Sequence, residues 1–144
     1  MLLTDSELTE YRRRGFIAKN CVFSERECES FREGAQRAEA QLLGRILEAA
    51  AESAATEYRL DGNRFVDLDM VTVQFEHASV KERLRVVEPV NEVERVFDRL
   101  LDDPRLCGPM RQIVSCERLA LWTAKLNFKH PRVGSGFGWH QDAP

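Results

Sequence analysis

The sequence lacks any long hydrophobic run, and the absence argues against a helix that crosses a membrane. No apolar stretch approaches the roughly 20 residues that a bilayer span requires, and residues 1–5 lack the basic region and apolar stretch of a signal peptide. The 21 Lys and Arg and the 24 Asp and Glu are mixed along the 144 residues, without a basic patch. These absences predict a cytoplasmic protein, with neither a membrane nor a nucleic acid as its partner.

The chain also lacks the cysteine spacing of a zinc site. Its four cysteines form no C-x-x-C pair, and thiols in a cytoplasmic protein stay reduced. We therefore predict that they pack as small buried hydrophobic residues. They are Cys21, Cys28, Cys107 and Cys116.

The first half of the chain carries two helix-start signals. Thr4 with Glu7, and Ser24 with Glu27, each have the spacing of a capping box. The first predicts a short helix that ends at Gly15 and is followed by a strand over 16–23. The second predicts a long helix from 25 to about 54, whose apolar residues form a core-facing stripe. The stripe consists of Phe31, Ala35, Ala38, Leu42, Ile46 and Ala50.

Strand and turn signals dominate the middle of the chain. The turn Asp61-Gly62-Asn63 predicts a hairpin whose second extended segment covers 65–75. A short strand over 84–87 follows, and then helices over 92–101, capped by Asn91, and 104–114.

Residues 119–129 predict one further strand. One face of this strand is apolar throughout, whereas the other turns polar towards its end. The polar residues are Thr123, Lys125, Asn127 and Lys129. Alternation alone leaves two interpretations open: a strand with one solvent-exposed face, or a barrel strand whose polar end points into a cofactor cavity.

A glycine-rich loop then leads to His140-Gln141-Asp142. On an extended segment, residues i and i+2 point to the same side, so this imidazole and carboxylate can bind one metal ion. A distant histidine would complete the two-His-one-carboxylate triad that binds Fe(II) and leaves positions open for cosubstrate and oxygen. On its own, the His-x-Asp pair also fits a surface loop without a metal.

Two parts of the chain resemble one known family. Lys125-Leu126-Asn127-Phe128-Lys129-His130-Pro131, followed by Trp139-His140-Gln141-Asp142-Ala143-Pro144, is similar to the strand and iron motif of phytanoyl-CoA dioxygenase-like proteins. Tyr11-Arg12-Arg13-Arg14-Gly15-Phe16-Ile17 and the following Cys21-Val22-Phe23-Ser24-Glu25-Arg26-Glu27 resemble the beginning of these Fe(II)- and 2-oxoglutarate-dependent dioxygenases.

The resemblance implies an α+β fold: a partial double-stranded β-helix, or jelly roll, with N-terminal helices packed on one sheet. Residues 1–144 would be the N-terminal portion of a single dioxygenase domain, truncated after the His-x-Asp motif. His140 and Asp142 would bind Fe(II), and Lys125 and Arg85 would contact the cosubstrate 2-oxoglutarate.

The implied reaction consumes O2 and 2-oxoglutarate and hydroxylates a small organic or acyl substrate. Halogenases of this broad family lack the carboxylate, so Asp142 favours hydroxylation or a related oxidation. The distal histidine and the arginine that pairs with 2-oxoglutarate are absent before Pro144, and His77 and His130 are poor substitutes. We therefore expect this chain alone to be inactive and to bind iron weakly.

Two rival functions stay open at this point. A truncated, non-catalytic paralogue could serve as an interaction module. A zinc-dependent hydrolase could use His140 and Asp142, although the chain lacks a paired-histidine signature such as H-E-x-x-H.

Overall fold

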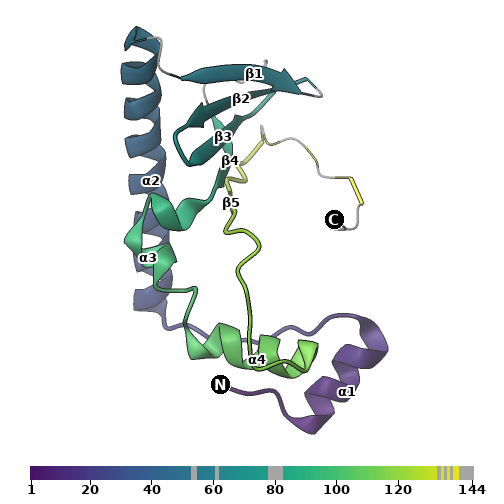
Figure 1. The fold of residues 1–144 in the computed structure, drawn as a ribbon. Helices are drawn as coiled ribbons and strands as arrows, with labels where there is room; N and C mark the ends of the chain where they lie inside the picture. The colour runs from purple at the N-terminus through teal and green to yellow at the C-terminus, as the bar shows by residue number, and fades with distance from the viewer. Residues whose placement is uncertain are drawn as a thin grey trace. The chain divides into compact units, whose positions relative to one another are not determined.

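The computed structural model describes residues 1–52, 55–60, 62–77, 83–132, 134, 136, 138 and 139. Figure 1 shows its helices and strands in chain order. They are α1 (Asp5–Arg14), α2 (Glu25–Glu52), β1 (Thr56–Leu60), β2 (Asn63–Leu68), β3 (Val71–Phe75), β4 (Leu84–Glu88), the 3-10 helix η1 (Val90–Glu92), α3 (Arg95–Asp98), α4 (Pro104–Val114) and β5 (Leu126–Asn127). The chain forms two units, one of Met1–Ala38 with Val90–Ala124 and one of Glu39–Pro89 with Lys125–Pro144.

Both predicted capping boxes are confirmed, and they start α1 and α2. The Glu7 carboxylate accepts from the Thr4 backbone N–H at 2.8 Å, and the Thr4 hydroxyl accepts from the Glu7 N–H at 3.3 Å. Ser24 and Glu27 make the same pair of bonds at 2.8 and 3.3 Å. Gly15 ends α1 in the left-handed conformation, with φ of 80°.

The predicted strand over 16–23 is wrong, because the structure has no strand between α1 and α2. Cys21 has a positive φ of 55°, which interrupts an extended backbone. Lys19 forms an ion pair with Glu7 of α1. A β-rich composition is therefore not enough where no neighbouring strand supplies hydrogen bonds.

The two predicted helices after residue 90 have different outcomes. The helix over 104–114 is confirmed as α4: Asp103 caps it and Pro104 occupies its first turn. The predicted helix over 92–101 is wrong in extent, because the chain forms η1 and then the short α3. Glu94 separates them with an extended backbone (φ −135°, ψ 118°), and its carboxylate accepts from the Val96 N–H.

The second unit contains an antiparallel sheet in which consecutive strands are neighbours, in the order β1-β2-β3-β4-β5. Gly62, with φ of 78°, forms the predicted hairpin turn between β1 and β2. The segment 65–75 was predicted as one strand, which is wrong. A turn at Asp69, with φ of 54°, separates β2 from β3.

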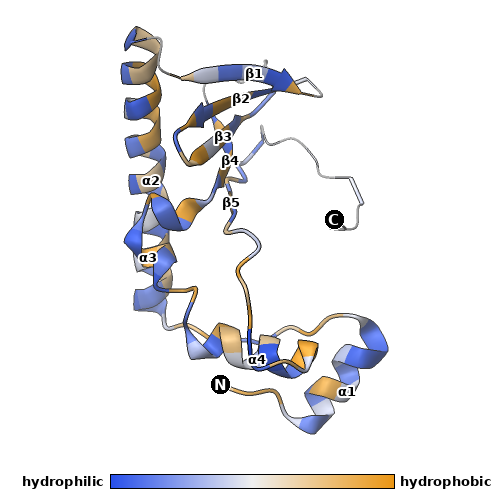
Figure 2. Ribbon diagram, viewed as in Figure 1, coloured by the Kyte–Doolittle hydropathy of each residue, from blue (hydrophilic) through white to orange (hydrophobic). Residues whose placement is uncertain are grey.

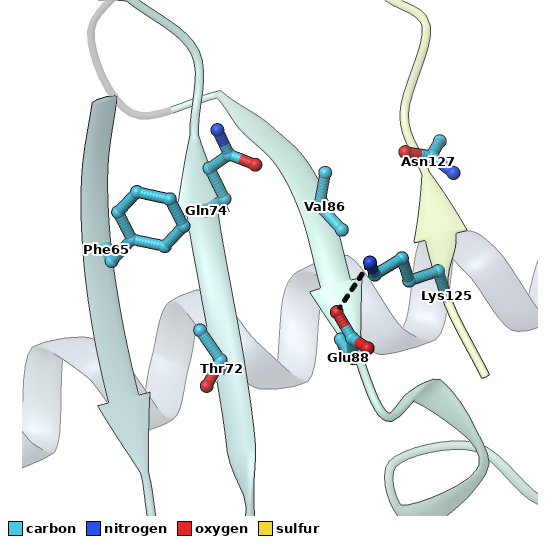
Figure 3. A pocket seen from close by; sticks show the side chains of 7 residues that line it. All are labelled: Phe65, Thr72, Gln74, Val86, Glu88, Lys125 and Asn127. Atoms are coloured by element: carbon cyan, nitrogen blue, oxygen red, sulfur yellow. Dashed lines mark ion pairs between the residues drawn. The ribbon is translucent and has the colours of Figure 1, made fainter. Parts of the chain in front are cut away.

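One face of the sheet forms the core of the second unit together with the C-terminal half of α2, which Figure 3 shows behind the strands. The buried strand residues include Val66, Leu68, Val71, Val73 and Val87. From α2, Leu42 and Ile46 are buried, whereas Ala50 of the predicted stripe is exposed. Each fully buried aliphatic side chain stabilises the fold by about 1.5–3 kcal/mol.

Apolar and polar residues alternate along α2, as Figure 2 shows. Such a helix buries one stripe and exposes the other face to water. No helix in the described part of the chain is apolar over a length that would cross a membrane.

The predicted α+β class is confirmed, and the sheet is open and antiparallel. The jelly roll stays a prediction. The strand expected over 119–129 is wrong in length, since β5 covers only Leu126 and Asn127. Trp122, expected on the apolar face of that strand, is 89% exposed.

The prediction of buried cysteines is also wrong. Cys21 and Cys116 are exposed, and Cys28 and Cys107 are partly exposed. All four are free thiols. Cys21 and Cys116 lie outside helices and strands, where no apolar layer covers them.

Candidate ligand pocket and metal-binding segment

A pocket of about 200 Å³ lies on the face of the sheet opposite the core (Figure 3). Side chains from four neighbouring strands and from Lys125 line it. They are Phe65, Thr72, Gln74, Val86, Glu88, Lys125 and Asn127. Sites for drug-sized ligands have roughly 300–1,000 Å³, so this pocket suits a smaller molecule.

The charged groups of the pocket are Lys125 and Glu88, which point towards one another in Figure 3. The Lys125 ammonium lies 3.2 Å from the Glu88 carboxylate, and the two side chains are 50% and 36% exposed. Ion pairs as exposed as this contribute little, typically about 0.2–1 kcal/mol. Breaking this ion pair therefore costs little.

The remaining lining combines amide and hydroxyl groups with an aromatic wall. Gln74 and Asn127 supply amides, and the Thr72 hydroxyl donates to the Asp67 carboxylate at 2.7 Å. The Phe65 ring stacks on Tyr58 with centroids 5.2 Å apart. A small polar molecule would find hydrogen-bond partners here on a fixed surface.

Sequence reasoning found Lys125 and placed Asn127 on the same face of its strand, and both line the pocket. The alternation at 125–127 was the signal, because Leu126 between them points to the other face. Thr72, Gln74 and Glu88 were missed. Register brings them together: Thr72 pairs with Glu88 and Gln74 with Val86, which no local pattern encodes.

Arg85, the second predicted cosubstrate contact, does not line this pocket. It is buried, with 7% of its surface exposed. Its guanidinium donates to the Asn63 side-chain oxygen at 3.1 Å and to the Gly136 carbonyl at 3.3 Å. A cosubstrate role for Arg85 stays a prediction.

The predicted metal ligands His140 and Asp142 lie outside the described residues, so their role also stays a prediction. Among the side chains that the structure does describe, no three His, Cys, Asp or Glu residues come together to hold a metal ion. Trp139, directly before His140, is fully exposed. His130 is engaged elsewhere, with its Nε2 atom 2.8 Å from the Leu84 carbonyl.

Together, these features define a mixed α+β protein with a small pocket, lined by both apolar and polar side chains, on the open face of its sheet. Residues 11–144 match the family model of phytanoyl-CoA dioxygenase (PhyH), and the chain belongs to this family. The matched range includes the pocket residues and the His-x-Asp motif.

One curated relative is the ectoine dioxygenase of Halomonas elongata. The chain is 39% identical to it over 59 residues, which make up 41% of this chain and 18% of the relative. The matched stretch therefore spans less than a fifth of the relative's length. No solved structure matches the chain.

Proposed function

We propose that the protein is an Fe(II)- and 2-oxoglutarate-dependent oxygenase that hydroxylates a small organic or acyl substrate. The observation that carries the proposal is the family match over residues 11–144, which includes the His-x-Asp motif. The small pocket with Lys125 and Asn127 supports it independently.

His140 and Asp142 would hold the iron. An imidazole and a carboxylate suit Fe(II), and their i, i+2 spacing lets them bind one ion from an extended segment. The bound metal would supply the activation of O2 that is coupled to the conversion of 2-oxoglutarate to succinate and CO2. The chain's part is to orient the reactants and to exclude water from them.

Lys125 would hold a carboxylate of 2-oxoglutarate in the pocket, and the Asn127 amide would donate a hydrogen bond to it. The pocket volume of about 200 Å³ suits such a small dicarboxylate, and Lys125 supplies the cation. Glu88 lies 3.2 Å from that cation and must release it for the ligand. This displacement makes Glu88 a competitor for the proposed site.

The substrate is proposed only as a class. The family is named for phytanoyl-CoA and the curated relative for ectoine, two chemically different molecules. A small organic or acyl molecule with a C–H bond near the iron satisfies the proposed chemistry, whichever of these classes it resembles.

The test is anaerobic titration of the protein with Fe(II) and 2-oxoglutarate, followed by absorption spectroscopy. A metal-to-ligand charge-transfer band that disappears in Asp142→Ala is the expected result. Iron binding that is equal in wild type and Asp142→Ala would contradict the assignment. Succinate release by the complete protein, with a panel of acyl and small polar molecules, would then identify the substrate.

A further inference from the structure

Two contacts tie the glycine-rich segment 130–138 to strand β4. The Arg85 guanidinium donates to the Gly136 carbonyl at 3.3 Å. The His130 ring nitrogen Nε2 lies 2.8 Å from the Leu84 carbonyl. The two contacts come from adjacent residues of β4, so one short stretch of that strand holds both His130 and Gly136.

Arg85 reaches the segment because the strand pairing shifts at this point. Gln74 of β3 pairs with Val86, but the next residue, Phe75, pairs with Leu84. Arg85 is thus the extra residue of a β-bulge. Bulges re-aim a side chain out of the regular alternation and are frequent next to active sites.

The side chain that the bulge redirects is buried and held at a second point. Arg85 is 7% exposed, and its guanidinium also donates to Asn63 of β2 at 3.1 Å. Its backbone carbonyl accepts from the Phe128 N–H at 2.9 Å. The same residue therefore fixes the end of β5 with its backbone and the glycine-rich segment with its side chain.

We infer that Arg85 is a positioning residue, which anchors the backbone at Gly136, in the glycine-rich segment that leads to the His-x-Asp pair. Glycines lose the most conformational freedom on ordering, so a segment with Gly134, Gly136 and Gly138 needs an external anchor. Metal affinity depends on such support, since loss of an outer partner typically weakens binding about 10–100-fold. The part that concerns metal binding rests on the proposed function, whereas the anchoring does not.

The first experiment measures hydrogen exchange of the backbone amides over 129–139 in the metal-free protein. Arg85→Met removes the donors and is expected to speed exchange roughly tenfold, as for loss of one hydrogen bond from a charged group. The matched control is Arg64→Met. This arginine of the same sheet lies over the Phe75 ring at 4.3 Å and pairs with Glu57. Unchanged exchange in Arg85→Met, or an equal rise in both variants, would overturn the inference.

The second experiment measures binding of Co(II), a spectroscopic substitute for Fe(II), in the absence of 2-oxoglutarate. Positioning predicts at least about tenfold weaker Co(II) binding in Arg85→Met and partial recovery in Arg85→Lys, which keeps one charged donor. A direct contact with the cosubstrate predicts the opposite: Co(II) binding stays the same, and only 2-oxoglutarate binds more weakly. That outcome would overturn the positioning role.

The two experiments separate the inference from the function on which it depends. If the wild-type protein binds no metal, the proposed function fails, and the exchange experiment alone decides whether Arg85 anchors the segment. If Arg85→Met does not fold, the exchange of Arg85→Lys replaces it. An exchange rate of Arg85→Lys above that of the wild type supports the anchor. Lysine cannot reach both Asn63 and Gly136, so an exchange rate equal to the wild type would contradict it.

Discussion

Replacing Glu88 with glutamine is expected to strengthen the binding of 2-oxoglutarate. In the structure, the Lys125 ammonium is paired with Glu88 at 3.2 Å, and a ligand carboxylate must take the place of that partner. With side-chain exposures of 50% and 36%, the pair contributes at most about 1 kcal/mol. Its removal should therefore tighten binding by up to roughly fivefold.

The assay is titration of 2-oxoglutarate into the Fe(II)-loaded protein under anaerobic conditions. Lys125→Met should weaken binding by about five- to tenfold and should abolish the gain from Glu88→Gln in the double variant. Glu57→Gln is the matched control, since this carboxylate pairs with Arg64 away from the pocket. A gain from Glu88→Gln that persists without Lys125, or unchanged binding in Lys125→Met, would refute the reasoning.

Three further predictions concern stability and can be measured by denaturant unfolding. Leu42→Ala leaves a cavity at a fully buried position and should lower the free energy of unfolding by about 2–5 kcal/mol. A loss below about 1 kcal/mol would contradict the placement of Leu42 in the core. Gly34→Ala should also destabilise, because the added Cβ would clash with Val96 Cγ1. Overpacking costs about 1–3 kcal/mol, against roughly 1 kcal/mol gained in helix propensity. Greater stability of the variant would show that Val96 moves freely. The hydrogen bond from Arg105 lowers the pKa of the Glu27 carboxyl from 4.5 to about 2. The stabilisation from this pair is therefore complete above pH 4.5 and is lost as the pH falls to 2. Arg105→Met should flatten the dependence of the unfolding free energy on pH in this range, and an unchanged slope would contradict the coupling.

Helix starts and tight turns could be predicted because their signals are local. A hydroxyl residue and a glutamate three positions later satisfy the first backbone N–H groups of a helix by themselves, as at Thr4 and Ser24. Gly62 likewise allows a positive φ wherever the chain must reverse. Such elements need no information from distant residues.

Strand extents could not be predicted, because a strand exists only where a partner pairs with it. The alternation over 119–129 continues for several residues before β5, yet the backbone pairs only at Leu126 and Asn127. Upstream, the Ala124 carbonyl accepts from the Val90 N–H at 2.8 Å. A non-local partner of this kind is invisible in the sequence pattern.

The candidate site divides along the same line. The residue types of the His-x-Asp motif and the face shared by Lys125 and Asn127 could be read locally. Glu88 as the partner of Lys125 could not, because strand register brings it there. The bulge that turns Arg85 towards Gly136 is equally non-local, since it arises from the pairing of β4 with β3.

The most direct test of the account is Fe(II) binding, measured by anaerobic titration of the wild-type protein, His140→Ala and Asp142→Ala. The account predicts that the wild type binds Fe(II) and that each substitution weakens binding at least about tenfold, since even an outer partner of a metal ligand has an effect of this size. Arg64→Met should bind iron as the wild type does. Equal iron affinity in all four proteins would contradict the central claim that this imidazole and this carboxylate hold the metal.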